Sequence, residues 1–580
     1  MITNVKKGLL AAALTVFFTF IGFACKDSFL SVAPTAQLAN SQLSTNAGIQ
    51  SLLVGAYASM NGRDFGWFGG SSNWLWGSVT GGDANKGSNA GDQSTAVFIQ
   101  NFTVTPSTGP GNDKWQAMYD GVSRSNNVLR ILGSAGPDVT DAIKKNVSGQ
   151  ARFLRGHYYF ELRKTFGSVP FVDESVDYGT GIDKVKNDKE IWPMIEADFK
   201  YAYDNIPEVQ DAPGRANKWA AAAYLAKTYM FQKKFAEAKA LFDQIIANGK
   251  TASGKKYGLL PKFQDVFNAA VSNSEESVFA IQAAANTGSV ANANPDFVLN
   301  FPYNGGPAGC CGFFQPSFDL ANSFRTNANG LPLLDGSYNA GANQLKTDQG
   351  IDSKTAFVPD AGPVDPRLDH SVGRRGLPYL DWGPHPGQDW IRDQTYGGPF
   401  APKKFIYYKS QDKTLTDGSS WTDGYSAINY NVIRYADVLL MAAEAEVELG
   451  GLENARKLVN QVRARAANAD SFVKGTDGKP AANYVINQYT TAWTDATVAR
   501  NAVQFERKLE LSGEGHRFFD LVRWGTAEKV LNAYFAYEGG KLPGTFTGAK
   551  FVTGKNEVMP IPQTQLDRQI GVLTQNKGYQ

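Results

Sequence analysis

The sequence predicts a mainly α protein, in which tetratricopeptide-like helical repeats form a scaffold that carries long irregular loops and a few short strands. Segments with apolar residues at the helical period fall into two blocks, at about residues 40–250 and 430–530. Each block contains two helices joined by a tight polar turn. Between the blocks, residues 251–429 are rich in glycine, proline, asparagine and aromatic residues.

The first block is expected to contain helices at residues 47–60, 113–132, 140–164, 188–205, 215–231 and 235–247. In NKWAAAAYLAKTYMFQKKFAEAKALFDQII, small alanines and large aromatic residues alternate on the faces that must meet. This pattern is typical of a repeat unit that buries its apolar face only by stacking on a neighbour.

The second block is expected to contain helices at residues 430–449, 452–467 and 499–511, and a short helical turn at 516–524. YADVLLMAAEAEVELGGLENARKLVNQVRARA follows the same pattern, with Gly450 and Gly451 at the turn. We therefore expect one domain over residues 25–580, with the loop-rich region inserted between the two blocks. ESVFAIQ is a strand-like run in that region. Because long irregular segments in compact domains are usually functional, we expect the ligand to bind there.

Residues 1–24 have the pattern of an export signal, in which Lys6 and Lys7 precede an uncharged apolar run. That run is shorter than the roughly 20 residues that a membrane-spanning anchor requires, which makes an anchor the weaker alternative. Cys25 follows a small residue, as in the lipobox of bacterial lipoproteins, although Gly22 stands where an aliphatic residue is usual. We expect Cys25 to be the lipidation site.

Composition excludes several classes of function. The chain has 57 basic and 55 acidic residues, so it lacks the net positive charge typical of nucleic-acid binding. It contains no H-E-x-x-H, G-x-S-x-G or P-loop motif, and its 4 histidines are scattered. We therefore expect no catalytic residues, no metal and no cofactor.

Six stretches, in this order, resemble the SusD/RagB family of Bacteroidota outer-membrane lipoproteins: CKDSFL, ARFLRGHYYFELRKTFGSVPFVDE, the alanine-rich repeat unit, NVIRYADVLLMAAEAEVELG, FERKLELSGEGHRFFDLVRWG and VMPIPQTQLDRQ. The resemblance implies a lipid-anchored protein on the surface of the outer membrane. It also implies a glycan-binding role, in which the protein captures oligosaccharides and delivers them to a SusC-like TonB-dependent transporter. Peptide binding, as in RagB-like members, is the alternative within the family.

Glu506, Glu510 and Glu514 recur at helical spacing among several arginines. A surface glycoside hydrolase could use two of them as an acid and a nucleophile. Carboxylates interleaved with arginine are held ionised, which is the wrong state for a general acid. The sequence therefore favours a structural network of ion pairs, and His516 belongs to it.

Candidate ligand contacts come from two loops. An early loop, NGRDFGWFGGSSNWLWGSVTGGDANKG, offers the aromatic residues Trp67, Trp74 and Trp76 for stacking on sugar rings, and Asp83 and Asn85 for their hydroxyls. Alternation in WLW predicts a strand with both tryptophans on one side. The central region adds four further candidates, Tyr303, Phe313, Phe314 and Trp382. Four tryptophans on helical patterns are expected in the core instead: Trp115, Trp192, Trp219 and Trp524.

Cys310 and Cys311 are adjacent in GPAGCCGFF. In an oxidising exterior they are expected to form a vicinal disulfide, although adjacent Cα atoms lie closer together than the usual range for a disulfide. A reduced pair packed into the loop is the alternative. Either way, we expect a rigid apolar loop tip beside the ligand surface, and neither a redox centre nor a nucleophile.

Overall fold

The computed structural model describes residues 40–62 and 67–580. The predicted export signal and the predicted lipidation site, Cys25, lie outside these ranges. None of the helices in the described residues has the length and apolar character needed to cross a membrane.

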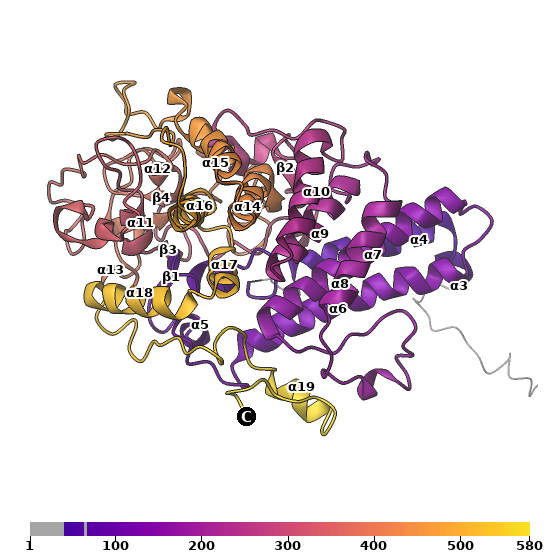
Figure 1. Cartoon of the computed structure of the whole chain (residues 1–580). Helices are drawn as coiled ribbons and strands as arrows, with labels where there is room; N and C mark the ends of the chain where they lie inside the picture. The colour runs from indigo at the N-terminus through magenta and orange to yellow at the C-terminus, as the bar shows by residue number, and fades with distance from the viewer. Residues whose placement is uncertain (1–39, 63–66) are drawn as a thin grey trace, which may run out of the picture.

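The first helical block is a continuous array in which each helix packs on the next (Figure 1). Helix α7 packs on both α6 and α8, α9 packs on α8, and α10 packs on α9. The block consists of α3 (Asn40–Leu43), α4 (Asn46–Ala58), α6 (Gly109–Gly133), α7 (Asp141–Phe166), α8 (Trp192–Asn205), α9 (Lys218–Phe231) and α10 (Phe235–Asn248). All six predicted helices are present, with ends displaced by a few residues.

Local sequence determines where these helices begin. Thr140 caps α7 by accepting a hydrogen bond from Ile143 N, and Asn217 caps α9 by accepting one from Ala220 N. The four consecutive alanines of α9 are buried, which allows α8 and α10 to pack closely against it.

The second block joins the first through α14 (Tyr435–Glu448), which packs on α10. Asp437 of α14 lies 3.1 Å from Lys227 of α9 and 2.7 Å from Arg507. Further along the chain lie α15 (Leu452–Ala466), α16 (Ala496–Glu510), α17 (Arg517–Trp524), α18 (Ala527–Lys541) and α19 (Gln563–Arg568). The two blocks therefore form one scaffold, and the mainly α, repeat-like fold class is confirmed.

One helix boundary was predicted wrongly. Residues 430–434 do not begin a helix but form β6 (Tyr430–Arg434), antiparallel to β2 (Ser277–Ile281). The tyrosine, valine and isoleucine of this segment favour a strand once β2 supplies a partner edge. Helix α18 was not predicted, because two glycines near its end weaken the helical pattern.

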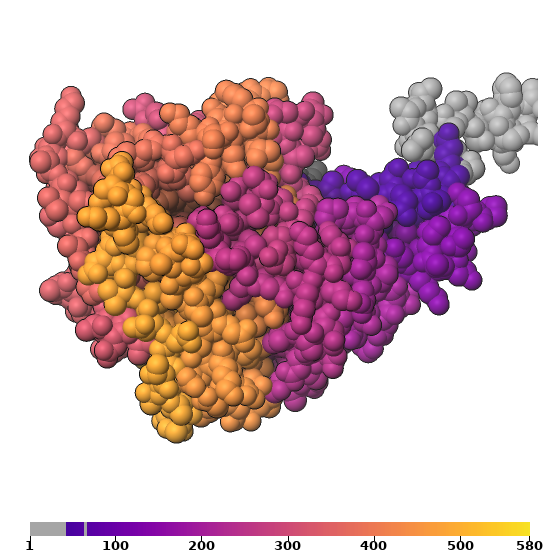
Figure 2. Space-filling model, turned by 90° about the horizontal axis from the view of Figure 1, so that it is seen from above, coloured from indigo at the N-terminus to yellow at the C-terminus, as the bar shows by residue number. Residues whose placement is uncertain are grey.

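The loop-rich region lies at the end of the molecule opposite the first helices (Figures 1 and 2). Its regular structure is limited to short elements. These are β3 (Phe313–Pro316), α11 (Phe318–Ser323), α12 (Leu368–Ser371), β4 (Val372–Gly373), α13 (Gln394–Gly397) and β5 (Ala401–Pro402). The early loop ends in β1 (Ala84–Gly87), and α5 (Thr95–Gln100) follows it.

A buried network of ion pairs ties these parts together. Glu510, at the end of α16, contacts Arg434 of β6 at 2.6 Å and Arg367, just before α12, at 2.9 Å, and it also pairs with Arg465 of α15. Burial alone would raise the pKa of Glu510, but Arg465, Arg434 and Arg367 hold it well below its usual range. One carboxylate thus connects two helices, a strand and the loop-rich region.

The neighbouring glutamates extend the network. Glu506 lies 2.7 Å from Arg367 and 2.8 Å from Arg463, and Glu514 lies 2.7 Å from both Arg434 and Lys404. All of these side chains are almost completely buried. The geometry therefore agrees with the predicted structural role of the three glutamates.

We expect Glu510→Gln to lower the free energy of unfolding by about 3–5 kcal/mol, because it leaves buried arginines without their compensating charge. Chemical denaturation followed by circular dichroism measures the change. Glu453→Gln on α15 is the control, since Glu453 is exposed and pairs with Arg456 on the surface. Equal stability of the two variants would contradict the structural role of Glu510.

Candidate ligand-binding surface

The early loop and the central loop meet in a two-stranded sheet. Strand β1 pairs antiparallel with β3, with Asn85 opposite Gln315 and Gly87 opposite Phe313. Because β3 begins two residues after Cys311, this pairing places the disulfide loop beside the early loop. The two predicted clusters of ligand residues are therefore neighbours.

Six of the predicted contact residues are buried within these loops, which corrects the expectation that they line the surface. Trp74 and Trp76 are each 2% exposed, and their indole nitrogens donate to the carbonyl oxygens of Trp67 and Phe68 at 2.9 and 2.7 Å. Asn85 donates to Gly397 O at 2.8 Å. The other buried residues are Asp83, Phe313 and Phe314.

The WLW segment is a π-helical turn, Trp74–Val79, and not the strand that its alternation predicted. The reason is a close approach between distant backbones. A Cβ at Gly77 would lie 1.9 Å from the carbonyl oxygen of Gly515, so only glycine fits there. Gly515 N also donates to Ser78 Oγ at 2.8 Å. Both tryptophans consequently point inward, and Trp74 packs against Phe314 with their ring centroids 5.7 Å apart.

Three predicted residues are partly exposed, namely Trp67, Tyr303 and Trp382. Trp67 meets Trp421 edge to face, with ring centroids 6.2 Å apart and planes at 77°. Trp421 is 46% exposed, and its indole nitrogen donates to the hydroxyl of Tyr425 at 3.2 Å. The two tryptophans form an accessible aromatic corner.

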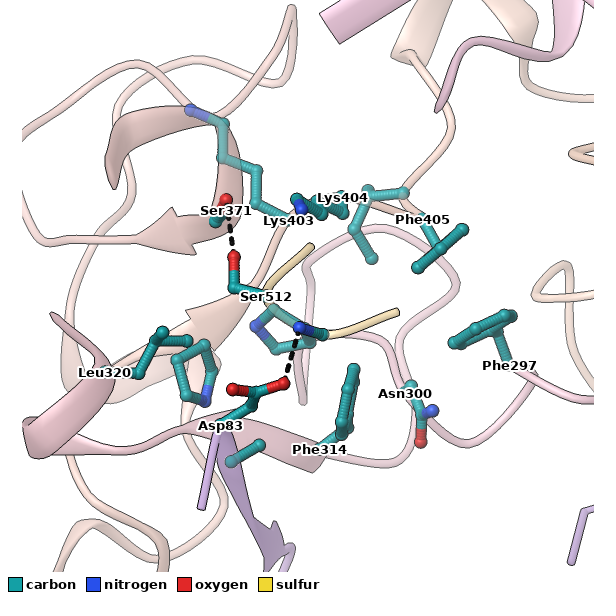
Figure 3. A pocket seen from close by; sticks show the side chains of 15 residues that line it. Asp83, Phe297, Asn300, Phe314, Leu320, Ser371, Lys403, Lys404, Phe405 and Ser512 are labelled. Atoms are coloured by element: carbon teal, nitrogen blue, oxygen red, sulfur yellow. Dashed lines mark hydrogen bonds between the residues drawn. The ribbon is translucent and has the colours of Figure 1, made fainter. Parts of the chain in front are cut away.

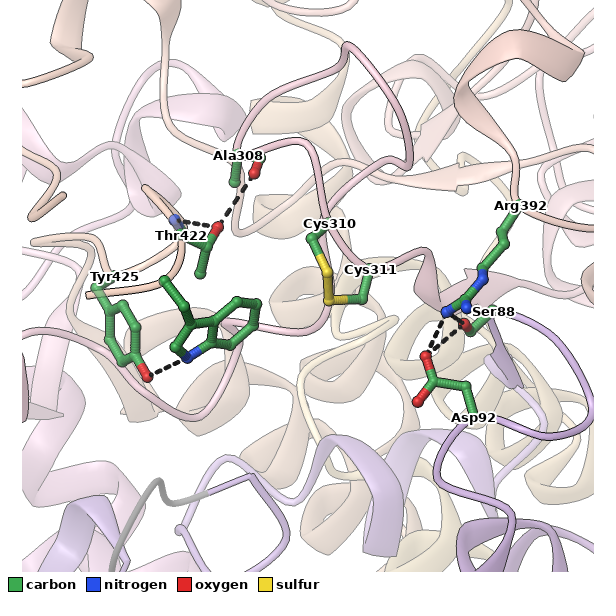
Figure 4. The surroundings of a disulfide bond; sticks show 10 residues. Ser88, Asp92, Ala308, Cys310, Cys311, Arg392, Thr422 and Tyr425 are labelled. Carbon is green, nitrogen blue, oxygen red and sulfur yellow. Dashed lines mark hydrogen bonds and ion pairs between the residues drawn. A yellow bond between two sulfur atoms is a disulfide. The ribbon is translucent and has the colours of Figure 1, made fainter.

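Cys310 and Cys311 form a disulfide. The loop that carries it is held on both sides: Ala308 N donates to the hydroxyl of Tyr407 at 2.9 Å, and Gly312 N donates to Phe301 O at 2.8 Å. Figure 4 shows the disulfide between Thr422, which donates to Ala308 O, and a polar cluster on its other side. The loop is therefore a fixed part of the surface.

The polar cluster consists of Arg392, Asp92 and Ser88 (Figure 4). Arg392 pairs with Asp92 and donates to Ser88 Oγ at 2.9 Å, while its guanidinium lies 5.2 Å from the ring centre of Tyr303. Arg392 and Asp92 have side chains 29% and 28% exposed, so both remain accessible to a ligand. We call Trp67, Tyr303, Cys310, Arg392 and Trp421 the disulfide-loop surface.

Trp382 lies beside this surface. Its indole nitrogen donates to Tyr407 O at 3.0 Å, and its ring meets that of Tyr407 with centroids 5.7 Å apart. Since the Tyr407 hydroxyl holds Ala308, Trp382 supports the disulfide loop from behind while keeping part of its ring exposed.

A small pocket of about 20 Å³ lies under the two loops (Figure 3). It is lined by Asp83, Asn300, Phe314 and Ser512, among others. Asp83 accepts from Gly513 N at 2.9 Å, and burial raises the pKa of its carboxyl to about 6. The cavity holds one water at most, so it is too small for a sugar. Asp83 is therefore structural.

The clustered glutamates and the histidines of the described residues do not combine into a catalytic site. Glu506, Glu510 and Glu514 are paired with arginine or lysine inside the core. Burial lowers the pKa of His157, His385 and His516 to about 3 and that of His370 to about 4, so these imidazoles are neutral. No three His, Cys, Asp or Glu side chains of residues 40–62 and 67–580 are grouped to hold a metal ion.

Sequence reasoning missed Trp421, Arg392 and Asp92. Trp421 lies in LTDGSSWTDGYS, a polar and glycine-containing loop of the kind that singled out Trp67, so the same argument could have found it. No local signal identified Arg392 and Asp92, because their pairing joins segments 300 residues apart.

Comparison with known families gives two matches that together cover most of the chain. The model described as "SusD family" matches residues 275–579. A second model, described as "Starch-binding associating with outer membrane", matches residues 28–230.

Individual proteins also resemble this chain in sequence or in structure. SusD-like protein P2 of Formosa agariphila is 26% identical over 585 residues, which covers 98% of each chain. A SusD superfamily protein of Bacteroides vulgatus superimposes with a TM-score of 0.67 at 21% identity, covering 92% of this chain and 98% of that one. Surface glycan-binding protein A of Bacteroides thetaiotaomicron, solved with laminarihexaose, gives a TM-score of 0.64 at 22% identity, with 92% and 99% coverage. At these identities the solved structures establish the fold.

We expect the free energy of unfolding of Asp83→Asn to increase relative to that of the wild type as pH rises. The carboxyl has a pKa of about 6 in the folded protein and about 4 in the unfolded chain, so the folded state loses stability as pH rises between these values. Asparagine removes this loss, which amounts to about 1–3 kcal/mol above pH 6. Denaturation at pH 4.5 and pH 8 measures it.

Asp437→Asn is the control with the opposite trend. Burial alone would raise the pKa of Asp437, but Lys227 and Arg507 hold it well below its usual range. The ionised carboxylate therefore stabilises the folded state, and Asp437→Asn should lower the free energy of unfolding most at neutral pH. A pH-independent effect of Asp83→Asn would contradict the burial of an ionisable carboxyl at this position.

We also expect iodoacetamide to add no carbamidomethyl group to Cys310 or Cys311 in the denatured, unreduced protein, because both sulfurs are bonded. After reduction, two groups should be added. Peptide mass mapping of the peptide that contains both cysteines reads the result, and Cys310→Ser, which leaves Cys311 as the one thiol of that peptide, is the positive control. Two groups added without reductant would show the alternative, a reduced pair.

Proposed function

Because this chain belongs to the SusD family, we propose that it is a glycan-binding protein that captures oligosaccharides at the disulfide-loop surface. The observation that supports this most directly is the aromatic corner of Trp67 and Trp421, next to the accessible Arg392–Asp92 pair. Such a surface offers two kinds of contact that a sugar needs, namely stacking on aromatic rings and hydrogen bonds to hydroxyl groups.

Aromatic rings supply the first kind of contact. The C–H face of a pyranose packs on the face of an indole, and the perpendicular arrangement of Trp67 and Trp421 suits a bent oligosaccharide better than a flat surface would. Trp421 is 46% exposed, which leaves it the area to stack on one sugar ring.

Arg392 and Asp92 supply the second kind, while the buried Ser88 accepts a hydrogen bond from Arg392 and holds it in place. A guanidinium donates and a carboxylate accepts, so this cluster suits the hydroxyl groups of neighbouring sugars. Arg392 also covers the ring of Tyr303 at 5.2 Å, which fixes its position. A cluster that is held in place before binding loses little entropy when the ligand arrives.

Relatives suggest which glycans to test. One similar structure is that of a laminarin-binding SusD-like protein, with a TM-score of 0.62 at 24% identity, and another holds laminarihexaose. For this chain, a β-glucan is therefore the first oligosaccharide to examine.

We infer that the protein binds its glycan without cleaving it. The only densely clustered glutamates that sequence patterns singled out are buried in ion pairs, which supports a binding role over that of a glycoside hydrolase. Carboxylates held ionised by arginine cannot donate the proton that glycoside cleavage requires.

We also propose that the protein delivers the bound glycan to a SusC-like TonB-dependent transporter. Acylation of Cys25 would anchor the chain to the outer membrane at the cell surface, close to such a partner. A binding protein tethered beside its transporter presents ligand at a high effective concentration, so moderate affinity is sufficient.

We expect Trp421→Ala to weaken binding of laminarihexaose about tenfold, since it removes about 1.4 kcal/mol of stacking. Isothermal titration calorimetry on the chain lacking residues 1–25 measures the affinity. Phe98→Ala on α5 is the control, because Phe98 is 47% exposed and lies outside the surface. Unchanged affinity in Trp421→Ala would refute this surface, and binding of peptides in place of any glycan would favour the RagB-like alternative.

A further inference from the structure

A pocket of about 400 Å³ lies in the first helical block, between the loop of residues 182–189 and the start of α8. Its lining combines apolar side chains, among them Phe171 and Met194, with one acid, Asp188, and three lysines. The lysines are Lys184, Lys186 and Lys189. The volume is within the range for small-molecule sites. We call it the lysine pocket.

The three lysines of this pocket are exposed and carry their charges without a partner. None of them forms an ion pair within the described part of the chain, and the one hydrogen bond that their side chains make there runs from Lys184 Nζ to Thr180 O at 2.7 Å. Three ammonium groups around one pocket repel one another. A bound anion would relieve this repulsion.

The loop that carries the lysines is held in place by Asn187, which is buried. Its Nδ2 donates to Ser168 O at 3.2 Å and to Thr574 O at 2.8 Å, and its Oδ1 accepts from Thr574 N at 2.9 Å. The segment that follows α19 thus fixes the lysine loop against the end of α7. The pocket is therefore formed before any ligand arrives.

Two exposed isoleucines lie on the segments beside the pocket. Ile570, just after α19, is 84% exposed, and Ile182, at the start of the lysine loop, is 38% exposed. Gln569 Nε2 donates to Ile182 O at 3.1 Å, which joins these two segments. A soluble anion would need only the lysines, whereas lysines next to exposed apolar side chains are typical of surfaces that bind anionic lipids.

Helix α6 relates the pocket to the start of the described chain. Tyr119, in the middle of α6, donates to Pro170 O at 2.7 Å, next to the pocket lining. Gly136, just beyond the end of α6, donates to Ser44 O at 2.9 Å, between α3 and α4. At the rise of an α-helix, these two contacts lie about 25 Å apart along α6.

A lipid on Cys25 would be within reach of the pocket. The residues between Cys25 and Asn40, where α3 begins, can span up to about 50 Å. This reach is longer than the distance along α6 between the pocket and α3. The membrane that holds the lipid could therefore meet this side of the first helical block.

We propose that Ile182, Ile570 and the three lysines form a membrane-contact surface. The ammonium groups bind phosphate groups of anionic lipids in the outer membrane, and the isoleucines enter the boundary of the acyl chains. The choice of a membrane over a soluble anion rests on the proposed anchoring at Cys25. Contact through the first block leaves the loop-rich region, at the other end of the molecule, free to take up glycan (Figure 1).

Co-sedimentation with vesicles tests this surface on the chain lacking residues 1–25, which has no lipid of its own. We expect the protein to bind vesicles of phosphatidylglycerol and phosphatidylcholine in equal parts and to bind pure phosphatidylcholine more weakly. High salt should release it, because salt screens the attraction between lysines and phosphates. A wild type that binds no anionic vesicle would overturn the proposal.

A triple variant, in which alanine replaces all three lysines of the pocket, should lower the partition coefficient on anionic vesicles about 100-fold, or about fivefold for each lysine. A control variant makes the same change of charge at three exposed lysines on α15 and in the loop that follows it: Lys457→Ala, Lys474→Ala and Lys479→Ala. The control should bind like the wild type. Equal binding by the two variants contradicts the lysine pocket.

A fluorescent label tests the apolar part of the surface. Because Cys310 and Cys311 are bonded to each other, Ile570→Cys provides a single free thiol for the dye NBD. We expect its emission to rise when anionic vesicles are added, since the dye enters an apolar environment. Val358→Cys, at a position 69% exposed in the loop-rich region, is the control and should not respond. The same response at both positions, or none at either, argues against the surface.

Calorimetry with laminarihexaose on the same proteins separates this surface from the proposed function. Glycan binding without vesicle binding overturns the membrane contact and leaves the glycan proposal standing. Vesicle binding without glycan binding supports the contact and refutes the glycan proposal. A triple variant that keeps its glycan affinity while losing vesicle binding supports both.

Two further results would assign the surface to another occupant. Saturable binding of inorganic phosphate, lost in the triple variant and not accompanied by vesicle binding, would show that the pocket takes a soluble anion. A dimer in analytical ultracentrifugation that the triple variant dissociates would show that the surface takes a second copy of the chain. Either result overturns the membrane contact.

Discussion

The pairing of Glu510 with arginines from three different parts of the chain is the constraint on which the rest of the structure depends. It joins α16 to α15, to β6 and to the segment before α12, and all partners are removed from water. A buried carboxylate tolerates this environment only while its partners remain in place. The helical scaffold therefore fixes the loop-rich region at Arg367 as firmly as it fixes its own helices.

Because the loop-rich region is anchored to the scaffold, its long irregular loops present a defined surface. The turn that contains Gly515 follows directly from this network and meets Gly77 of the early loop at close range. Strand β1 then carries the early loop to β3, directly beyond the cysteines. The disulfide-loop surface is thus reached from Glu510 by a continuous series of buried contacts, and a ligand would meet side chains that are already in position.

Aromatic residues in these loops serve two different roles, which only their depth distinguishes. Trp74, Trp76 and Phe314 fill the space between the early loop and the scaffold, while Trp67 and Trp421 lie at its outer side. The inner rings give the loops the apolar core that a loop normally lacks. The outer rings remain available because the space beneath them is already filled.

The sequence alone determined the helices and their repeat-like pairing, because an apolar period of 3.6 residues and capping residues such as Thr140 act locally. It also indicated that Glu506, Glu510 and Glu514 are structural, although the arginines that pair with them, Arg367, Arg434, Arg463 and Arg465, come from other segments than the motif. The tertiary structure decided which loop residues face solvent. Gly77 beside Trp74 meets Gly515, Asp83 accepts from Gly513 N, and Arg392 pairs with Asp92 across a sequence separation of 300 residues. Contacts between such distant segments leave no periodic signal in a single sequence.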